Sequence, residues 1–328
     1  MADPNKNIAA SPANGLVFAA DLGGTHLRAA AVDEMGGIHV RLKHPTPRAN
    51  SADEIVRSLV LAVQECEKQI SRENHIRAIS IAVPGTVDVE KGIVVKAPNL
   101  NCLDGYPLTK VLSEKLQRPA ILENDANAAA MGEMWRGAGR GRSTIVCVTL
   151  GTGVGGGIIL EGKLWRGVDG AAAEVGHMCV DPFGGVACGC GSRGCLEVYA
   201  SATAIVRMTR EASPRYPDST LQVEANLTGE TIYAAGIAGD ELALEVFRRM
   251  GVYLGIGLAN LINIINPEMI VIGGGVMNGW ELFEKHMHQQ VAERAFPLLA
   301  ARVRIVRAEC GDDAGLLGAA RLVFARSG

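Results

Sequence analysis

The sequence predicts an α/β protein in which one strand–turn–strand unit occurs twice. The first copy spans residues 16–32 and is broken by glycines at 23–24. The second copy spans 145–160 and is broken by the Gly-Thr-Gly turn at 151–153. Strands and helices alternate after each copy, as is typical of α/β folds. We therefore expect a duplicated fold, with two domains that flank a cleft.

The remaining elements follow from apolar spacing. Ile55, Leu59, Val63 and Cys66 recur at helical spacing, and Ser51 with Glu54 predicts a capping box at the start of that helix. The other expected elements are strands at 79–83, 120–122, 269–272 and 303–306, a helix at about 252–265 that ends before Pro267, and a closing helix from Ala314.

Length and composition set the broad class. A chain of 328 residues is long enough for two domains. We expect a polar tail at 1–15, a smaller domain from 16–122 with about 312–328, and a larger domain at 123–311. The net charge of −3 argues against nucleic acid or an anionic membrane as a partner. With neither a signal peptide nor an apolar run of spanning length, and with few cysteines, a cytoplasmic protein is expected.

A cysteine cluster is the densest chemical motif. Cys188, Cys190 and Cys195 have the spacing C-x-C-x4-C, and His177 lies eleven residues upstream. Three thiolates and one imidazole are the donors of a closed tetrahedral Zn²⁺ site. The alternative is a turn with ordinary buried cysteines, but this spacing favours the metal. A closed site does no chemistry itself, so the neighbouring carboxylates Glu174 and Glu197 are of interest.

Both glycine turns suit phosphate groups. Their exposed N–H groups and hydroxyls would bind phosphate oxygens, and the carboxylate before the first turn could hold Mg²⁺. The second turn also matches a dinucleotide-binding pattern, but that pattern must open a helix, and Ile158-Ile159 predict a strand. Either turn alone could be a hairpin without a ligand; together they favour a nucleotide. The residues concerned are Asp21, Gly23, Gly24, Thr25, Gly151, Thr152 and Gly153.

Asp125 is the candidate general base. It lies where a strand ends and an alanine-rich helix begins, beside Asn124. Asp and Asn are also ordinary helix N-caps, so the position has a purely structural explanation. The functional one is favoured because Glu123-Asn124-Asp125-Ala126-Asn127 holds more polar groups than one cap needs. An aspartate at a helix start should stay ionised and accept a hydroxyl proton.

Five motifs in order make the chain resemble the ROK family of sugar kinases and repressors: DLGGTHLR, ENDANAAA, LGTGVGGGI, EVGH and CGCGSRGCLE. The resemblance covers the chain after residue 15 and implies the ribonuclease-H-like fold of the actin-like ATPases. It implies that Asp125 is the base and that sugar hydroxyls are bound by Gly85, Asn99, Asn124, Glu174, His177 and Glu197. It implies zinc at His177, Cys188, Cys190 and Cys195, phosphate binding at both glycine turns, and adenosine at Gly274. His26 stands where the family often has lysine or asparagine.

Within the family the motifs are most similar to those of ATP-dependent glucokinases. The resemblance therefore implies ATP, Mg²⁺ and structural Zn²⁺, transfer to the 6-hydroxyl of glucose in glycolysis, and a dimer or tetramer. Kinases of N-acetylmannosamine, N-acetylglucosamine or fructose are alternatives, as is polyphosphate as donor. A sugar-responsive repressor is disfavoured because we see no helix-turn-helix ahead of Gly23. A binder without catalysis should show a degraded base or phosphate loop, and both are intact.

Overall fold

The computed structural model describes residues 15–47, 51–221 and 227–326. Packing divides the chain into two compact units. Unit 1 is formed by the described parts of Met1–Ser143, Gly157–Ala172 and Glu309–Gly328, and unit 2 by Thr144–Gly156 and Ala173–Ala308. The expected tail lies outside the described residues except for Gly15. The domain boundaries expected from the sequence stay a prediction.

Unit 1 is built on a five-stranded sheet of order β3-β2-β1-β4-β7. β1 is antiparallel to β2 and parallel to β4, which is parallel to β7. The interior strand β1 is an almost continuous apolar run that is buried on both faces. The strands are β1 (Gly15–Leu22), β2 (His26–Val32), β3 (Ile38–Pro45), β4 (His75–Val83) and β7 (Ala120–Asn124).

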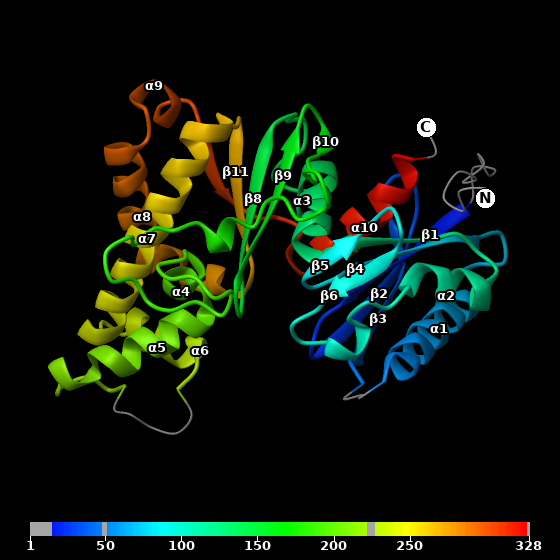
Figure 1. Cartoon of the computed structure of the whole chain (residues 1–328), viewed down its shortest axis with the longest axis horizontal. Coiled ribbons are helices and arrows are strands. Elements are labelled where there is room, and N and C mark those ends of the chain that lie inside the picture. The colour runs from blue at the N-terminus through cyan, green and yellow to red at the C-terminus, as the bar shows by residue number, and fades with distance from the viewer. Residues whose placement is uncertain (1–14, 48–50, 222–226, 327–328) are drawn as a thin grey trace. The chain divides into compact units, whose positions relative to one another are not determined.

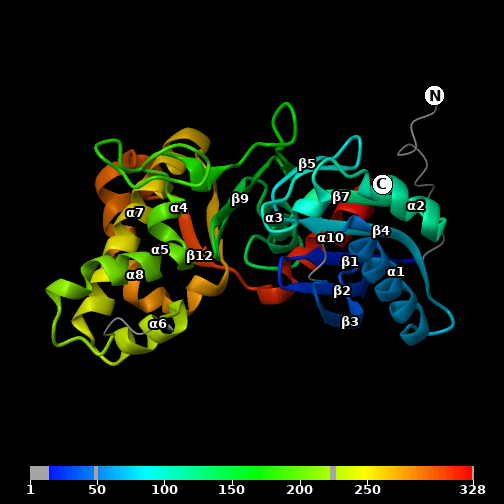
Figure 2. The same ribbon diagram turned by 60° about the horizontal axis from the view of Figure 1, so that its bottom comes forward.

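Helices cover both faces of this sheet. α1 (Ala52–Gln69) and α2 (Leu108–Leu116) share one core with the Phe18 face of β1. α10 (Ala314–Phe324) packs against β1 and β4, and α3 (Asp125–Arg136) packs on α10 (Figure 2). A small hairpin, β5 (Thr86–Asp88) with β6 (Ile93–Lys96), and the 3₁₀ turn η1 (Asn101–Leu103) complete this part.

The second sheet has the order β10-β9-β8-β11-β12, which repeats that of the first. β10 is antiparallel to β9, and β11 is parallel to both β8 and β12. In both sheets a hairpin of antiparallel strands is followed by parallel strands, which confirms that the strand–turn–strand motif occurs twice (Figure 1). The strands are β8 (Ile145–Leu150), β9 (Val154–Leu160), β10 (Lys163–Leu164), β11 (Met269–Gly273) and β12 (Arg304–Arg307).

Unit 2 contains most of the other helices. The longest, α7, is buried along much of its length and packs on α8. The helices are α4 (Glu197–Ala200), α5 (Ala202–Ala212), α6 (Gly229–Ile237), α7 (Glu241–Ile265), α8 (Trp280–Arg294) and α9 (Pro297–Ala300). The 3₁₀ turns are η2 (Val175–His177), η3 (Ser213–Arg215) and η4 (Gly275–Gly279), and η5 (Gly311–Asp313) lies in unit 1.

Two local expectations were wrong. Ser51 is the N-cap of α1, but its side chain makes no cap hydrogen bond, so the capping box is not formed. α7 begins eleven residues before the expected start, because the side chain of Asp240 accepts a hydrogen bond from Ala243 N (3.1 Å) and caps the helix there. The strand after Gly153 is confirmed, which removes the dinucleotide-binding interpretation of that loop.

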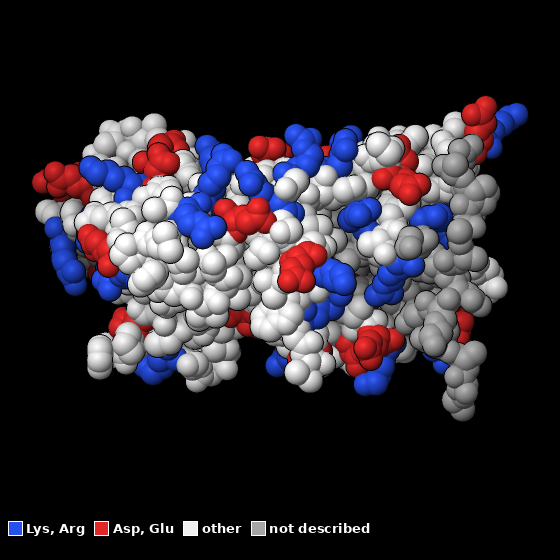
Figure 3. Space-filling model, turned by 90° about the horizontal axis from the view of Figure 1, so that it is seen from above, with Lys and Arg blue, Asp and Glu red and all other residues white. Residues whose placement is uncertain are grey.

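The surface carries charges of both signs. Figure 3 shows Lys and Arg interspersed with Asp and Glu over the face it draws, in keeping with the net charge of −3. Among the described helices, none combines the length and the apolar character that crossing a bilayer requires.

Candidate active site

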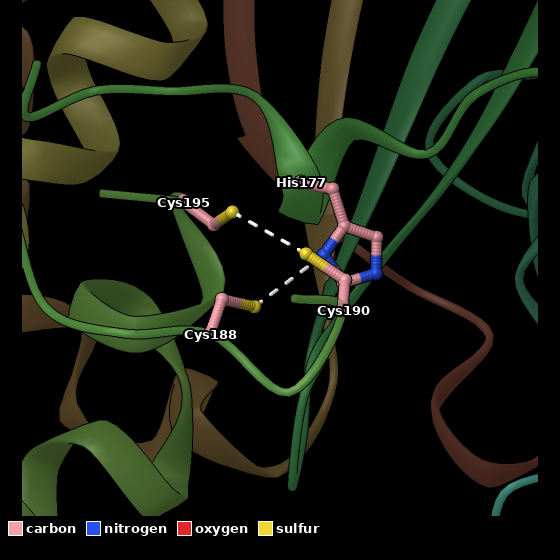
Figure 4. Close-up of side chains that lie close together, drawn as sticks. All are labelled: His177, Cys188, Cys190 and Cys195. Carbon is pink, nitrogen blue, oxygen red and sulfur yellow. Dashed lines mark hydrogen bonds between the residues drawn. The ribbon is translucent and has the colours of Figure 1, made fainter. Parts of the chain in front are cut away.

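The four expected metal ligands meet in unit 2. His177 comes from η2, and Cys188, Cys190 and Cys195 come from the loop that leads into α4. Their ligand atoms all lie within 4.8 Å of one another, and Figure 4 shows the imidazole and the three sulfurs pointing toward one another. The loop folds back because Cys188 N donates to Ser192 O (2.8 Å) and because the backbones of Cys195 and Cys179 pair in an isolated antiparallel β-bridge.

The spacing of these atoms fits a tetrahedral ion. Two sulfurs at about 2.3 Å from Zn²⁺ and at the tetrahedral angle lie about 3.8 Å apart, and a sulfur and an imidazole nitrogen lie about 3.5 Å apart. Cys190 Sγ and Cys195 Sγ are separated by 3.8 Å, and Cys188 Sγ and His177 Nδ1 by 3.7 Å. The donor set and these two separations therefore suit a structural zinc ion.

His177 presents its two ring nitrogens to different partners. Nδ1 faces Cys188 in the cluster, whereas Nε2 lies 3.8 Å from Glu174 Oε2. Glu174 is the residue before η2, so the short turn brings its carboxylate to the side of the ring away from the thiols. A histidine that binds a metal through one nitrogen can donate through the other in a fixed direction. The Glu174–His177 pair can thus offer an acceptor and a donor to neighbouring hydroxyl groups.

Glu197 joins the cluster to the second glycine turn. It is the first residue of α4, and its Oε2 accepts a hydrogen bond from Val154 N (3.1 Å). Its other oxygen, Oε1, lies 3.9 Å from Cys188 Sγ. A Cβ at Gly153 would lie 2.4 Å from Glu197 Oε2, so only glycine allows the turn and the carboxylate to approach this closely.

Tyr199 supports the same loop and was not anticipated from the sequence. Its hydroxyl donates to Asp181 Oδ2 (2.8 Å) and accepts from Val186 N (2.9 Å), and its ring stacks on Tyr253 at 3.9 Å. Burial raises the pKa of Tyr199 to about 12, so the hydroxyl keeps the proton that it donates. An isolated tyrosine in a helix gives no sequence signal for this role.

The second glycine turn lies beside a cavity of about 460 Å³ in unit 2. Gly151 N donates to Gly153 O (2.9 Å), and Thr203 Oγ1 of α5 donates to Thr152 O (2.8 Å). The cavity is lined by Thr152, Ala202, Thr203, Val206, Arg207, Arg210, Glu211 and Gly229. The involvement of α5 was not predicted, because nothing in its sequence distinguishes it from an ordinary amphipathic helix.

Gly274 follows β11 and precedes η4 with φ +94°. A Cβ there would lie 2.3 Å from Leu150 O, so both the backbone angle and the close approach to the end of β8 require glycine. Gly274 and the Gly151–Gly153 turn are therefore held next to each other at the ends of neighbouring strands.

In unit 1, Asn124 rather than Asp125 caps the start of α3. Asn124 is the N-cap: its Oδ1 accepts from Asn127 N (3.0 Å), and its Nδ2 donates to Gly85 O (2.9 Å). Asp125 is the first helical residue, and one of its oxygens accepts from Ala126 N (2.8 Å). Since the cap is supplied by Asn124, Asp125 is not needed as one.

Two expected sugar contacts of unit 1 lie on adjoining loops. Gly85, with φ +92°, follows β4, where a Cβ would meet Lys96 O at 2.2 Å. Asn99 is exposed, and its Cβ would lie 2.9 Å from a Cβ at Gly24. Asn99 thus adjoins the first glycine turn, and Gly85 adjoins Asn124.

The first glycine turn joins β1 and β2. Gly23 N donates to His26 O (3.0 Å), and Thr46 Oγ1 donates to Gly23 O (2.6 Å). Asp21 precedes the turn, and Arg28 Nη1 lies 3.7 Å from its carboxylate. Burial raises the pKa of Asp21, while Arg28 lowers it and Asp312 raises it. A half-buried carboxylate whose charge is only partly compensated by Arg28 is suited to a cation, and Thr25 is exposed beside it.

The chain belongs to the ROK family, because the model of that family matches residues 17–326. The glucokinase of Halalkalibacterium halodurans is 37% identical over 92% of this chain and 93% of its own length. A solved structure, a ROK family glucokinase from Streptomyces griseus in complex with glucose and AMPPNP, is 36% identical with a TM-score of 0.79. That similarity covers 94% of this chain and 99% of the other, which confirms the expected actin-like ATPase fold.

Regulators also occur among the relatives. The xylose repressor of Bacillus subtilis is 34% identical over 75% of this chain and 60% of its own length. Family membership alone therefore does not separate a kinase from a repressor, and the residues of the site have to decide.

Proposed function

We propose that the chain is an ATP-dependent hexokinase that phosphorylates the 6-hydroxyl of glucose. The observation that carries the proposal is the pairing of whole-length similarity to glucokinases with an Asp125 that the helix does not need as a cap. A carboxylate at a helix start that does not serve as the cap is suited to accept a proton from a substrate hydroxyl.

Asp125 is assigned the role of general base. Its half-buried carboxylate would accept the proton of the 6-hydroxyl as that oxygen attacks the γ-phosphoryl group of ATP. Asp21 would hold Mg²⁺, which when bound neutralises charge on the phosphate groups. The N–H groups of both glycine turns, at Gly23–Thr25 and Gly151–Gly153, would bind phosphate oxygens.

Sugar hydroxyls would be bound by both hydrogen-bond donors and hydrogen-bond acceptors. Asn124 and Asn99 can donate and accept, and Glu174 and Glu197 accept. His177 donates through Nε2 when zinc occupies the cluster, because the ion fixes the other nitrogen. In this proposal zinc is structural: it orders the loop from which His177 and Glu197 are presented.

The nucleotide is assigned to unit 2. A cavity of about 460 Å³ beside Thr152 could take a nucleoside, and Gly274 stands at the neighbouring strand end. Room for a nucleoside next to a phosphate-binding turn favours ATP over polyphosphate as the donor, since polyphosphate has no nucleoside to place there. Glycolysis, a cytoplasmic location and a homo-oligomer stay predictions.

A panel of hexoses with ATP and Mg²⁺ tests the proposal. Glucose, fructose, N-acetylmannosamine and N-acetylglucosamine would be compared by ADP release and by mass spectrometry of the sugar phosphate. We expect the highest kcat/KM with glucose and a glucose 6-phosphate product. A higher kcat/KM with another hexose would move the assignment to that kinase, and retarded DNA without phosphorylation would favour a repressor.

A further inference from the structure

Glu123 is a buried carboxylate directly before the proposed base. It lies on β7, its side chain is 1% exposed, and its Oε1 accepts from Asn124 N (3.0 Å) and Asn127 Nδ2 (3.1 Å). These two donors flank Asp125 on either side along the chain. The orientation of the Asn124–Asn127 turn therefore depends on where the Glu123 carboxylate is held.

Arg166 holds the other oxygen of that carboxylate. Its Nε and Nη2 lie 2.8 and 2.7 Å from Glu123 Oε2, a two-pronged contact that a lysine could not reproduce. The backbone of Arg166 is itself fixed, since Trp165 N donates to Ile158 O (2.8 Å) and Ala172 N donates to Arg166 O (3.1 Å). The arginine is thus a rigid anchor for Glu123.

The charge of Glu123 requires such an anchor. A carboxylate removed from water is strongly destabilising unless it is paired and hydrogen-bonded. Arg326 is a second positive neighbour: burial lowers its pKa, as does Arg166, whereas Glu123 raises it. With Arg166 replaced, Glu123 would still have one cationic neighbour, so the fold can persist while the carboxylate loses its fixed direction.

We propose that Arg166 is a positioning residue for phosphoryl transfer, acting through Glu123 on the turn that carries Asn124 and Asp125. The inference rests on the proposed function, because it takes Asp125 as the general base. Arg166 touches neither the sugar nor ATP in this proposal.

Arg166→Met tests it, with Arg118→Met as the matched control. Arg118 is also in unit 1, is 29% exposed against 30% for Arg166, and pairs with Glu67 of α1. Both variants would be assayed well below their Tm. We expect Arg166→Met to lower kcat by about 10²-fold, the cost of a displaced catalytic group, with the KM for ATP unchanged. Arg118→Met should keep the wild-type kcat, and Arg166→Lys should recover part of the loss.

Hydrogen exchange of the backbone amides of 124–127 gives a readout that does not need activity. We expect faster exchange at these amides in Arg166→Met than in the wild type or in Arg118→Met. A folded Arg166→Met protein with wild-type kcat, or with unchanged exchange at 124–127, overturns the proposal. If the wild-type chain phosphorylates no hexose, the proposed function fails by itself, and the exchange measurement still decides whether Arg166 orders the turn.

Discussion

Asp125→Asn should separate catalysis from stability almost completely. The cap of α3 is made by Asn124, and the contact of Asp125 with Ala126 N uses an oxygen that asparagine also has. The substitution also removes one negative charge from the first helical turn, worth about 0.3–1 kcal/mol. The catalytic loss is that of a general base, about 10²–10⁴-fold in kcat, or roughly 3–5 kcal/mol of barrier.

The assay pairs steady-state kinetics with thermal unfolding of the same samples. We expect a Tm within about 4 °C of the wild type together with the loss of kcat. Asn124→Ala is the structural counterpart: it removes the cap and the bond to Gly85 O, and should cost about 0.5–2 kcal/mol through the cap alone. An Asp125→Asn enzyme with a kcat within tenfold of the wild type would refute the assignment of the base.

Three further predictions concern other parts of the site. Gly153→Ala should displace Glu197, because its Cβ would lie 2.4 Å from Oε2; losing one contact of a charged group should lower kcat/KM for glucose by about 10–100-fold, measured at saturating ATP. Asp21→Asn should abolish activity but raise the Tm at pH 7. Burial raises the pKa of this carboxyl, so its ionisation destabilises the folded state; in melts at several pH values the gain should vanish as the pH falls below the ordinary value of 3.8. Purified protein should carry about one zinc ion per chain by atomic absorption, and Cys190→Ser should lose the metal and raise the KM for glucose; a metal-free wild type with full activity would contradict this.

The sequence was most informative where chemistry imposes spacing. The C-x-C-x4-C spacing together with His177 is typical of residues that bind one metal ion, and the four ligand atoms do lie close together. The glycine turns were equally readable, because a strand that stops at Gly23-Gly24 and resumes at Leu27 has to be a hairpin. Such patterns are local in the sequence, so they can be recognised without knowledge of the rest of the fold.

Other features could not be read from the chain. Whether Asp125 capped α3 was undecidable, because Asn124 and Asp125 are both good caps and only the backbone shows which one does so. Ser51 and Glu54 matched a capping box that the side chains do not form. Arg166 is 43 residues from Glu123, and no pattern of spacing connects an arginine in a loop to a carboxylate on a distant strand.

The crossing of α3 and α10 has a consequence for how this enzyme could change. A Cβ at Gly132 would lie 2.1 Å from Ala314 O, and one at Gly318 would lie 1.6 Å from Ala128 O, so main chain rests on main chain. α3 begins at Asp125, and a Cβ at Gly315 of α10 would lie 3.4 Å from the carboxyl carbon of Asp21. At Gly132 and Gly318 the helices meet main chain to main chain, so the spacing between the two carboxylates depends little on which side chains the helices carry. A change of sugar specificity would therefore have to arise in the loops, while the contact between α3 and α10 stays constant.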